Sequence, residues 1–162
     1  MTYDSKPDTL DHIVRVQHFM SEAVENLLNR ALVHDQSKLE EPEKSVLDRV
    51  TPKLRELTYG SDEYKASLAE MGDALQHHYR VNRHHPEHWS GGIYNMSLLD
   101  LIEMFCDSKA ATERHADGDI MRSIDHNAGR FDLTDLLANI FRNTARELGW
   151  TAQPPGSENN NE

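Results

Sequence analysis

Apolar side chains recur every three or four residues along this chain, and that spacing restricts its fold more than any other feature. Near the start, the apolar positions follow the 3.6-residue repeat of an α-helix, namely Leu10, Ile13, Val14, Met20, Val24, Leu27, Leu28 and Ala31. Further helical stretches are predicted from Pro42 to a stop at Gly60, over 62–82, 97–116 and 119–129, and from 132 to 149, with Ser97 and Asp132 as N-caps. Strand-like alternation is absent. The sequence therefore predicts an all-α fold, a compact single-domain helical bundle of about six helices.

The length fits one domain with its own core. We expect residues 1–149 to form that domain. Residues 150–162, "WTAQPPGSENNNE", are polar and contain two prolines, so we expect a disordered C-terminal tail.

The charge restricts the partners. With 17 basic and 28 acidic residues the formal net charge is −11, and no basic run offsets it, so we expect no nucleic-acid polymer as a partner. A small anionic substrate remains compatible if a metal or a few placed cations bind it. The sequence contains no long apolar run, so we expect no membrane contact and a cytoplasmic location in a bacterial or phage-infected cell. A homo-oligomer is compatible with the sequence.

The segment "VHDQSK" carries the strongest chemical signal. His34 and Asp35 offer an imidazole and a carboxylate side by side, which suits Zn, Fe, Mn, Ni or Co. Asp107 lies on a strongly apolar helix, where a carboxylate is costly unless it is paired or binds a metal. Glu103, one turn earlier, can orient a ligand histidine. The single cysteine excludes a Cys-rich zinc site.

A second histidine source lies on the first predicted helix. His12 falls at the edge of its apolar stripe, where it can line an internal cavity. His18 lies nearer the polar face and is the alternative ligand.

Five of the ten histidines lie in the stretch "LQHHYRVNRHHPEHW". In an unbroken helix His78 and His85 would be about 10 Å apart, too far for one metal or a metal pair. Pro86 predicts a helix end near Asn82, which would let them converge. We favour His78 over His77 as a ligand because it lies on the apolar side. The choice between His84 and His85 stays open.

The order of these motifs resembles the HD-domain superfamily of metal-dependent phosphohydrolases. A closer resemblance is to an uncharacterised phage and bacterial HD-like family, through "HD-x-SKLEEPE", "YGS-x-EY", "HHY-x-x-NRHHPEH" and "EM-x-x-D-x-KAAxxR". The resemblance implies an HD-like domain with one or two divalent transition-metal ions. The implied metal ligands are His12, His34, Asp35, His78, His85 and Asp107.

The resemblance also implies the chemistry. Asp35 and Lys38 would be catalytic, with Lys38 on the substrate phosphate and Glu103 behind a ligand histidine. Further substrate contacts are expected from His77, His84, Arg83 and Arg114. The implied activity is phosphohydrolase (phosphomonoesterase or phosphodiesterase) action on a nucleotide or other small phosphorylated metabolite. The alternatives are an HD-fold di-iron oxygenase and a non-catalytic, metal-stabilised phage or host binding protein.

Overall fold

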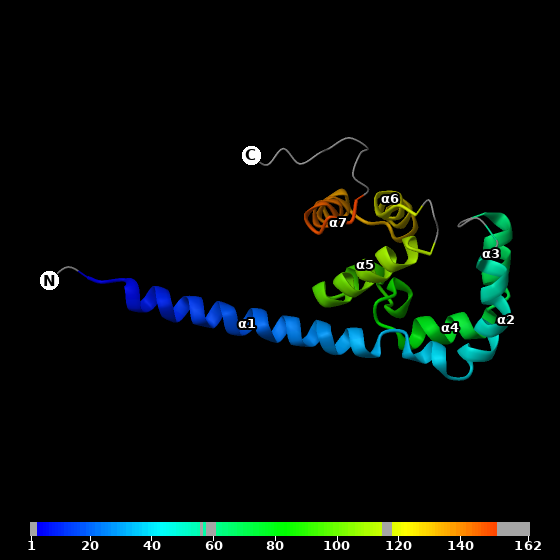
Figure 1. The fold of residues 1–162 in the computed structure, drawn as a ribbon, viewed down its shortest axis with the longest axis horizontal. Helices are drawn as coiled ribbons and strands as arrows, with labels where there is room; N and C mark the ends of the chain where they lie inside the picture. The colour runs from blue at the N-terminus through cyan, green and yellow to red at the C-terminus, as the bar shows by residue number, and fades with distance from the viewer. Residues whose placement is uncertain (1–2, 56, 58–60, 115–117, 152–162) are drawn as a thin grey trace, which may run out of the picture. The chain divides into compact units, whose positions relative to one another are not determined.

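The computed structural model describes residues 3–55, 57, 61–114 and 118–151, and all of the regular secondary structure in these residues is helical. Within them there is no strand, which confirms the all-α prediction. Figure 1 shows the α-helices α1 (Lys6–Val33), α2 (Glu43–Arg55), α3 (Asp62–Ala69), α4 (Gly72–Val81), α5 (Leu98–Thr112), α6 (Ile120–Phe131) and α7 (Asp135–Glu147). Short 3₁₀ helices cover Gln36–Leu39, Pro86–His88 and Gly92–Asn95. None of the helices in the described residues has the length and apolarity that a membrane span requires.

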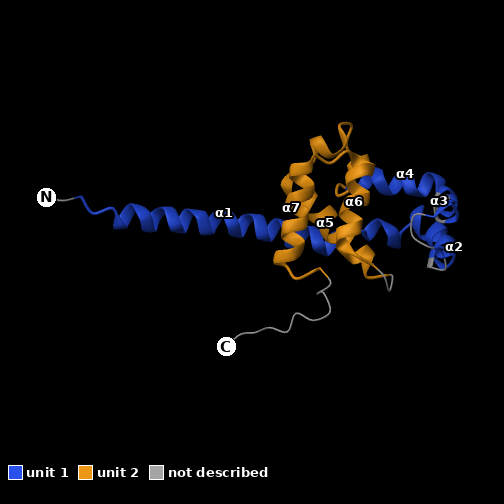
Figure 2. Ribbon diagram, turned by 90° about the horizontal axis from the view of Figure 1, so that it is seen from above, with its two compact units in different colours: residues 1–82 blue, residues 83–162 orange. Residues whose placement is uncertain are grey.

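The chain divides into two compact units, residues 1–82 and 83–162, which are coloured separately in Figure 2. The boundary falls inside the domain that the sequence predicts for residues 1–149. The predicted tail starts too early, because Trp150 packs against the core of unit 2. From position 152 onward the tail lies outside the described residues, and so does the predicted stop at Gly60.

Helix α1 is the long first helix that the periodicity predicts, but its apolar stripe is not part of a core. No residue of α1 is buried, and Leu10, Ile13 and Val14 are 52%, 44% and 62% exposed. Within unit 1, the helix runs away from α2, α3 and α4 (Figure 1). A periodic stripe identifies an amphipathic helix, but it does not say which surface covers the stripe.

The rest of unit 1 is built by α2, α3 and α4. The α2 helix packs against both of the others, with Val50 completely buried. The sequence predicts one helix over 62–82, and this is wrong, since α3 ends at Ala69 and Gly72 begins α4 with a left-handed φ of 46°. The predicted end before Pro86 is confirmed, because α4 ends at Val81 and Asn82 is extended.

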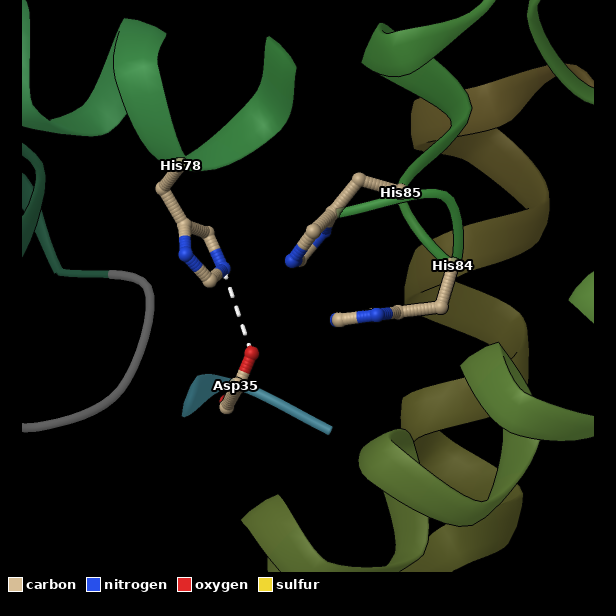
Figure 3. Close-up of side chains that lie close together, drawn as sticks. All are labelled: Asp35, His78, His84 and His85. Atoms are coloured by element: carbon tan, nitrogen blue, oxygen red, sulfur yellow. Dashed lines mark ion pairs between the residues drawn. The ribbon is translucent and has the colours of Figure 1, made fainter. Parts of the chain in front are cut away.

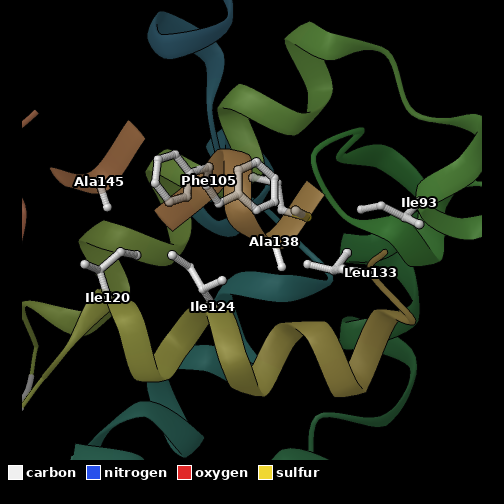
Figure 4. Close-up of a cluster of buried hydrophobic side chains, with 9 residues drawn as sticks. Ile93, Phe105, Ile120, Ile124, Leu133, Ala138 and Ala145 are labelled. Atoms are coloured by element: carbon white, nitrogen blue, oxygen red, sulfur yellow. The ribbon is translucent and has the colours of Figure 1, made fainter. Parts of the chain in front are cut away.

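Unit 2 is organised by α5, α6 and α7 around one apolar cluster (Figure 4). The buried members are Ile93, Met104, Phe105, Ile120, Ile124, Leu133, Ala138, Phe141 and Ala145. Phe105 of α5 stacks on Phe141 of α7 with 4.9 Å between ring centroids. Asp132 is not the N-cap of α7 as predicted, because Thr134 caps that helix and Asp132 ends α6 in the left-handed region.

A capping box fixes the start of α5. The Ser97 hydroxyl accepts a hydrogen bond from the Asp100 backbone N–H, and the Asp100 carboxylate accepts one from the Ser97 backbone N–H at 2.8 Å. Arg83 donates to the same carboxylate at 3.2 and 3.4 Å and lies over the Trp89 ring. Asp100 is completely buried, so it connects the first residue of unit 2 to the start of α5.

Replacing Asp100 with alanine is expected to lower the free energy of unfolding by about 1–3 kcal/mol, because the cap is lost and polar partners are left without an acceptor. Urea denaturation followed by circular dichroism measures the change. Asp135→Ala, at an exposed site in the first turn of α7, is the control and should cost less than about 1 kcal/mol. Equal losses from the two variants would contradict the assigned role of Asp100.

Candidate metal centre

The His34–Asp35 doublet lies at a sharp turn. The α1 helix ends at Val33, His34 leaves it with φ −53° and ψ 127°, and Asp35 takes a left-handed φ of 58°. The 3₁₀ helix Gln36–Leu39 starts directly afterwards and carries Lys38. The turn holds the imidazole, the carboxylate and the ammonium group on a short, well-defined stretch of backbone.

The Asp35 carboxylate offers its two oxygens to different neighbours. Oδ1 lies 3.5 Å from Nε2 of His78, the pair joined by a dashed line in Figure 3. Oδ2 lies 3.5 Å from Nε2 of His34 and 2.5 Å from Nζ of Lys38. The carboxylate is therefore placed between two imidazoles, both of which belong to unit 1.

Each of the two 3.5 Å separations suits a pair of metal ligands better than a hydrogen bond. A good N–H···O bond has its heavy atoms at about 2.7–3.2 Å. Two ligands that each lie about 2.1 Å from a tetrahedral ion are separated by about 3.4 Å. Asp35 and His78 are thus spaced like two ligands of one divalent transition metal, and His34 has the same spacing to the other oxygen of the carboxylate.

The protonation states agree with that chemistry. Burial of the carboxyl acts to raise the pKa of Asp35, but the charge and hydrogen bond of Lys38 outweigh it, aided by His34 and His78, so that pKa lies below its ordinary value. Burial, and then the Lys38 charge, lower the pKa of His78 despite the opposing effect of Asp35 and Glu43. At neutral pH an ionised Asp35 and a neutral His78 are thus the ligand forms that a metal requires.

The same pKa shifts predict how stability depends on pH. Because the pKa of His78 is lowered in the folded chain, the unfolded chain takes up a proton first as pH falls below about 6.5. Stability that is present above that pH is therefore lost below it. The pKa values of Asp35 and Glu43 are also lowered in the folded chain. These two carboxyl groups therefore cause a further loss of stability as pH falls below about 4.

Urea unfolding of the metal-free chain across a pH series measures this dependence. We expect His78→Gln to reduce the loss of stability between about pH 6.5 and 5, and the exposed His18→Gln to leave it unchanged. A wild-type free energy of unfolding that stays constant over this range would contradict the prediction.

A buried glutamate of α2 stands behind the histidines of α4. Glu43 is 1% exposed, and its Oε1 and Oε2 atoms lie 2.7 Å from Nδ1 of His77 and 2.9 Å from Nδ1 of His78. Sequence reasoning missed this residue. A signal was present, because Glu43 lies seven residues before the buried Val50 and so falls on the same face of α2.

Unit 2 contains a separate cluster of two histidines and a carboxylate. His84 is 1% exposed, and its Nδ1 lies 3.3 Å from Oε1 of Glu103. His85 is half-buried, and its ring lies 4.1 Å from that of His84 (Figure 3). The sequence left the choice between the two histidines open. The structure gives His84 the carboxylate partner that is typical of a metal-ligating imidazole.

The remaining predicted residues of unit 2 lie in different surroundings. Asp107 is half-buried on α5, and Arg114 is exposed just beyond the end of that helix. Arg83 donates a hydrogen bond to Asp100 and lies over the Trp89 ring. The predicted ligand set joins residues of both units, and a metal shared between them stays a prediction.

The course of α1 contradicts the prediction that His12 is a metal ligand together with His34. The helix is continuous from Lys6 to Val33, so the 22 residues between His12 and His34 span about 33 Å. One chain cannot bring both imidazoles to one metal across a straight helix of that length. His18, the alternative ligand, lies about 24 Å from His34 along the same helix and fails for the same reason. The sequence already predicted this helix, but the predicted ligand set did not take its length into account.

Neither the curated proteins nor the solved structures contain a match to this chain. The model of a family described as "Family of unknown function (DUF5662)" matches residues 1–148. This range includes the turn at His34–Asp35, Glu43 and all of the histidines in the stretch from Leu75 to Trp89. The match covers most of the chain, which therefore belongs to the DUF5662 family.

Proposed function

We propose that this protein is a metal-dependent phosphohydrolase that acts on a nucleotide or another small phosphorylated metabolite. The observation that carries the proposal is the Asp35–His78 pair, whose Oδ1 and Nε2 atoms are 3.5 Å apart. The Nδ1 atom on the other side of the same imidazole contacts Glu43 at 2.9 Å. A carboxylate, an outward-facing ring nitrogen and a supporting carboxylate are the parts of a typical protein metal site.

Four residues of unit 1 would have separate roles in binding the metal and the phosphate group. Asp35 and His78 would hold the ion, with His34 beside the other oxygen of Asp35, and Lys38 would neutralise a phosphate oxygen. A divalent metal in such a site lowers the pKa of a coordinated water and polarises a phosphoryl group. The net charge of −11 favours a small substrate over a polyanion, because only a few placed cations oppose it. A cytoplasmic location, in a bacterial or phage-infected cell, belongs to the same proposal.

Metal analysis followed by a phosphate-release screen tests the proposal. The purified chain is loaded in turn with Mn, Co, Ni, Fe and Zn and is then incubated with nucleotides and other small phosphate esters. Release of phosphate by wild type, and its loss in His78→Gln, is the expected result. A fully metallated protein that releases no phosphate from any substrate would overturn the proposal.

Oxygen consumption by the iron-loaded protein tests the first alternative, an HD-fold di-iron oxygenase. Two irons per chain, together with visible absorption and oxygen uptake, would indicate that the protein is an oxygenase and not a hydrolase. Metal-dependent stability without turnover in either assay would indicate a binding protein instead.

A further inference from the structure

We infer that Glu43 is the positioning residue of this site and that it fixes both His77 and His78 with the proton on Nδ1. The ring Nε2 atoms then keep their lone pairs, and that of His78 faces Asp35. The inference deepens the proposed function, on which its metal-binding consequence rests. It begins from one buried carboxylate that contacts two successive imidazoles, at 2.7 Å and 2.9 Å.

The first step is the ionisation of Glu43. A glutamate carboxyl with its ordinary pKa of about 4.3 is ionised at neutral pH, and each oxygen of Glu43 faces a separate imidazole nitrogen, at 2.7 Å and 2.9 Å. An ionised carboxylate only accepts hydrogen bonds. Each ring nitrogen that contacts Glu43 must therefore carry a proton, and in both rings that nitrogen is Nδ1.

The second step concerns a competing donor. The Asn82 Nδ2 atom lies 2.9 Å from Nδ1 of His78, and an amide N–H pointing there would require an unprotonated Nδ1. The same Nδ2 atom also lies 2.8 Å from the Ser37 hydroxyl oxygen and 2.9 Å from the His78 carbonyl oxygen. An amide nitrogen has two hydrogens, and these two oxygens account for both. Nδ1 of His78 thus keeps its proton for Glu43.

The arrangement also supplies the rigidity that a metal site needs. Glu43 begins α2, whereas His77 and His78 lie on α4, so one carboxylate fixes two rings across the contact between these helices. A buried carboxylate is costly unless its oxygens are satisfied. The two imidazoles and Ser37 meet that requirement, so the rings are held before any ion arrives.

His77 acquires a more specific role from the same contact. Its side chain is 25% exposed, and with the proton on Nδ1 its Nε2 can only accept a hydrogen bond or bind a metal. In that tautomer the neutral ring of His77 cannot donate a hydrogen bond from Nε2 to a phosphate oxygen. It can instead accept a hydrogen bond from a hydroxyl group of a phosphorylated substrate.

Nitrogen-15 NMR of the metal-free full chain at about pH 8, where histidines are neutral, reads the tautomers directly. We expect both rings in wild type to show the Nδ1–H pattern. In Glu43→Gln the amide can accept from one ring but must donate to the other, so at least one ring should change to the Nε2–H pattern. Glu40→Gln, at an exposed position nearby, should change neither.

Metal titration of the same variants is the second readout. Glu43→Gln should bind divalent metal about 10–100-fold more weakly than wild type, as is usual when the partner of a ligand histidine is lost. Glu40→Gln should bind like wild type. The wild-type spectrum needs no variant, so the test holds even where Glu43→Gln fails to fold.

The outcomes separate the two proposals. Wild-type rings in the Nε2–H form, or tautomers that do not respond to Glu43→Gln, would overturn the role of Glu43 even if metal binds. Responsive tautomers in a chain that binds no metal would uphold the role of Glu43 and overturn the metal-dependent function.

Discussion

Replacing Asp35 with asparagine is expected to lower the affinity for divalent transition metals by at least about 100-fold, since losing even a supporting partner of a ligand costs 10–100-fold. The amide keeps the shape of the side chain but removes its negative charge. It also replaces one of the two oxygens that face His78 and His34 at 3.5 Å. Isothermal titration of the metal-free protein with Mn, Co or Zn measures the loss.

Asp48→Asn is the matched control. Asp48 forms an exposed pair with Lys44 at 2.7 Å, so it resembles the Asp35–Lys38 pair without any histidine in the contact. This variant should bind metal with wild-type affinity. If Asp35→Asn also bound like wild type, the carboxylate between the two imidazoles would not be a metal ligand.

Replacing Phe105 with alanine is expected to destabilise unit 2 by about 3–5 kcal/mol. The ring is 5% exposed, stacks on Phe141, and lies 5.1 Å from the Trp150 ring. The cost combines the lost burial with the cavity that remains, and aromatic pairing adds about 0.5–1.5 kcal/mol. Since whole domains are stable by only about 5–15 kcal/mol, the variant should lose much of its near-ultraviolet circular dichroism at moderate temperature.

Leu136→Ala provides the comparison for this core prediction. Leu136 lies on α7 like Phe141 but is 72% exposed, so its truncation should change the free energy of unfolding by less than about 0.5 kcal/mol. Urea denaturation of both variants gives the two values. Similar losses would mean that the α5–α7 cluster does not carry the stability of unit 2.

The parts of the fold that the sequence predicted well are those decided by local chemistry. Ser97 caps α5 as expected, and the helix before Pro86 ends at Val81, because caps and prolines act within one turn. The uninterrupted helix over 62–82 failed at Gly72, whose left-handed φ breaks it. The apolar stripe of α1 contains no buried residue, because periodicity does not determine what packs against a helix.

In the candidate metal centre, too, local features were predicted from the sequence, whereas contacts between helices were not. His78 was preferred over His77 from its apolar side of the helix, and it is the more buried of the two. The partner expected for Glu103 is present as His84. Glu43 was missed because its contacts with His77 and His78 cross from α2 to α4, and a sequence does not reveal such contacts between helices. His12 failed because the continuous helix α1 separates it from His34.

The left-handed backbone at Asp35 gives position 35 a second requirement, independent of its carboxylate. A φ of 58° costs most residues about 1–2 kcal/mol, whereas glycine, asparagine and aspartate adopt it readily. Glycine and asparagine therefore suit the backbone but lack the charge, and glutamate has the charge but not the backbone preference. Among the twenty amino acids aspartate alone meets both requirements, so no single replacement at this position is neutral and evolution has little room for variation there.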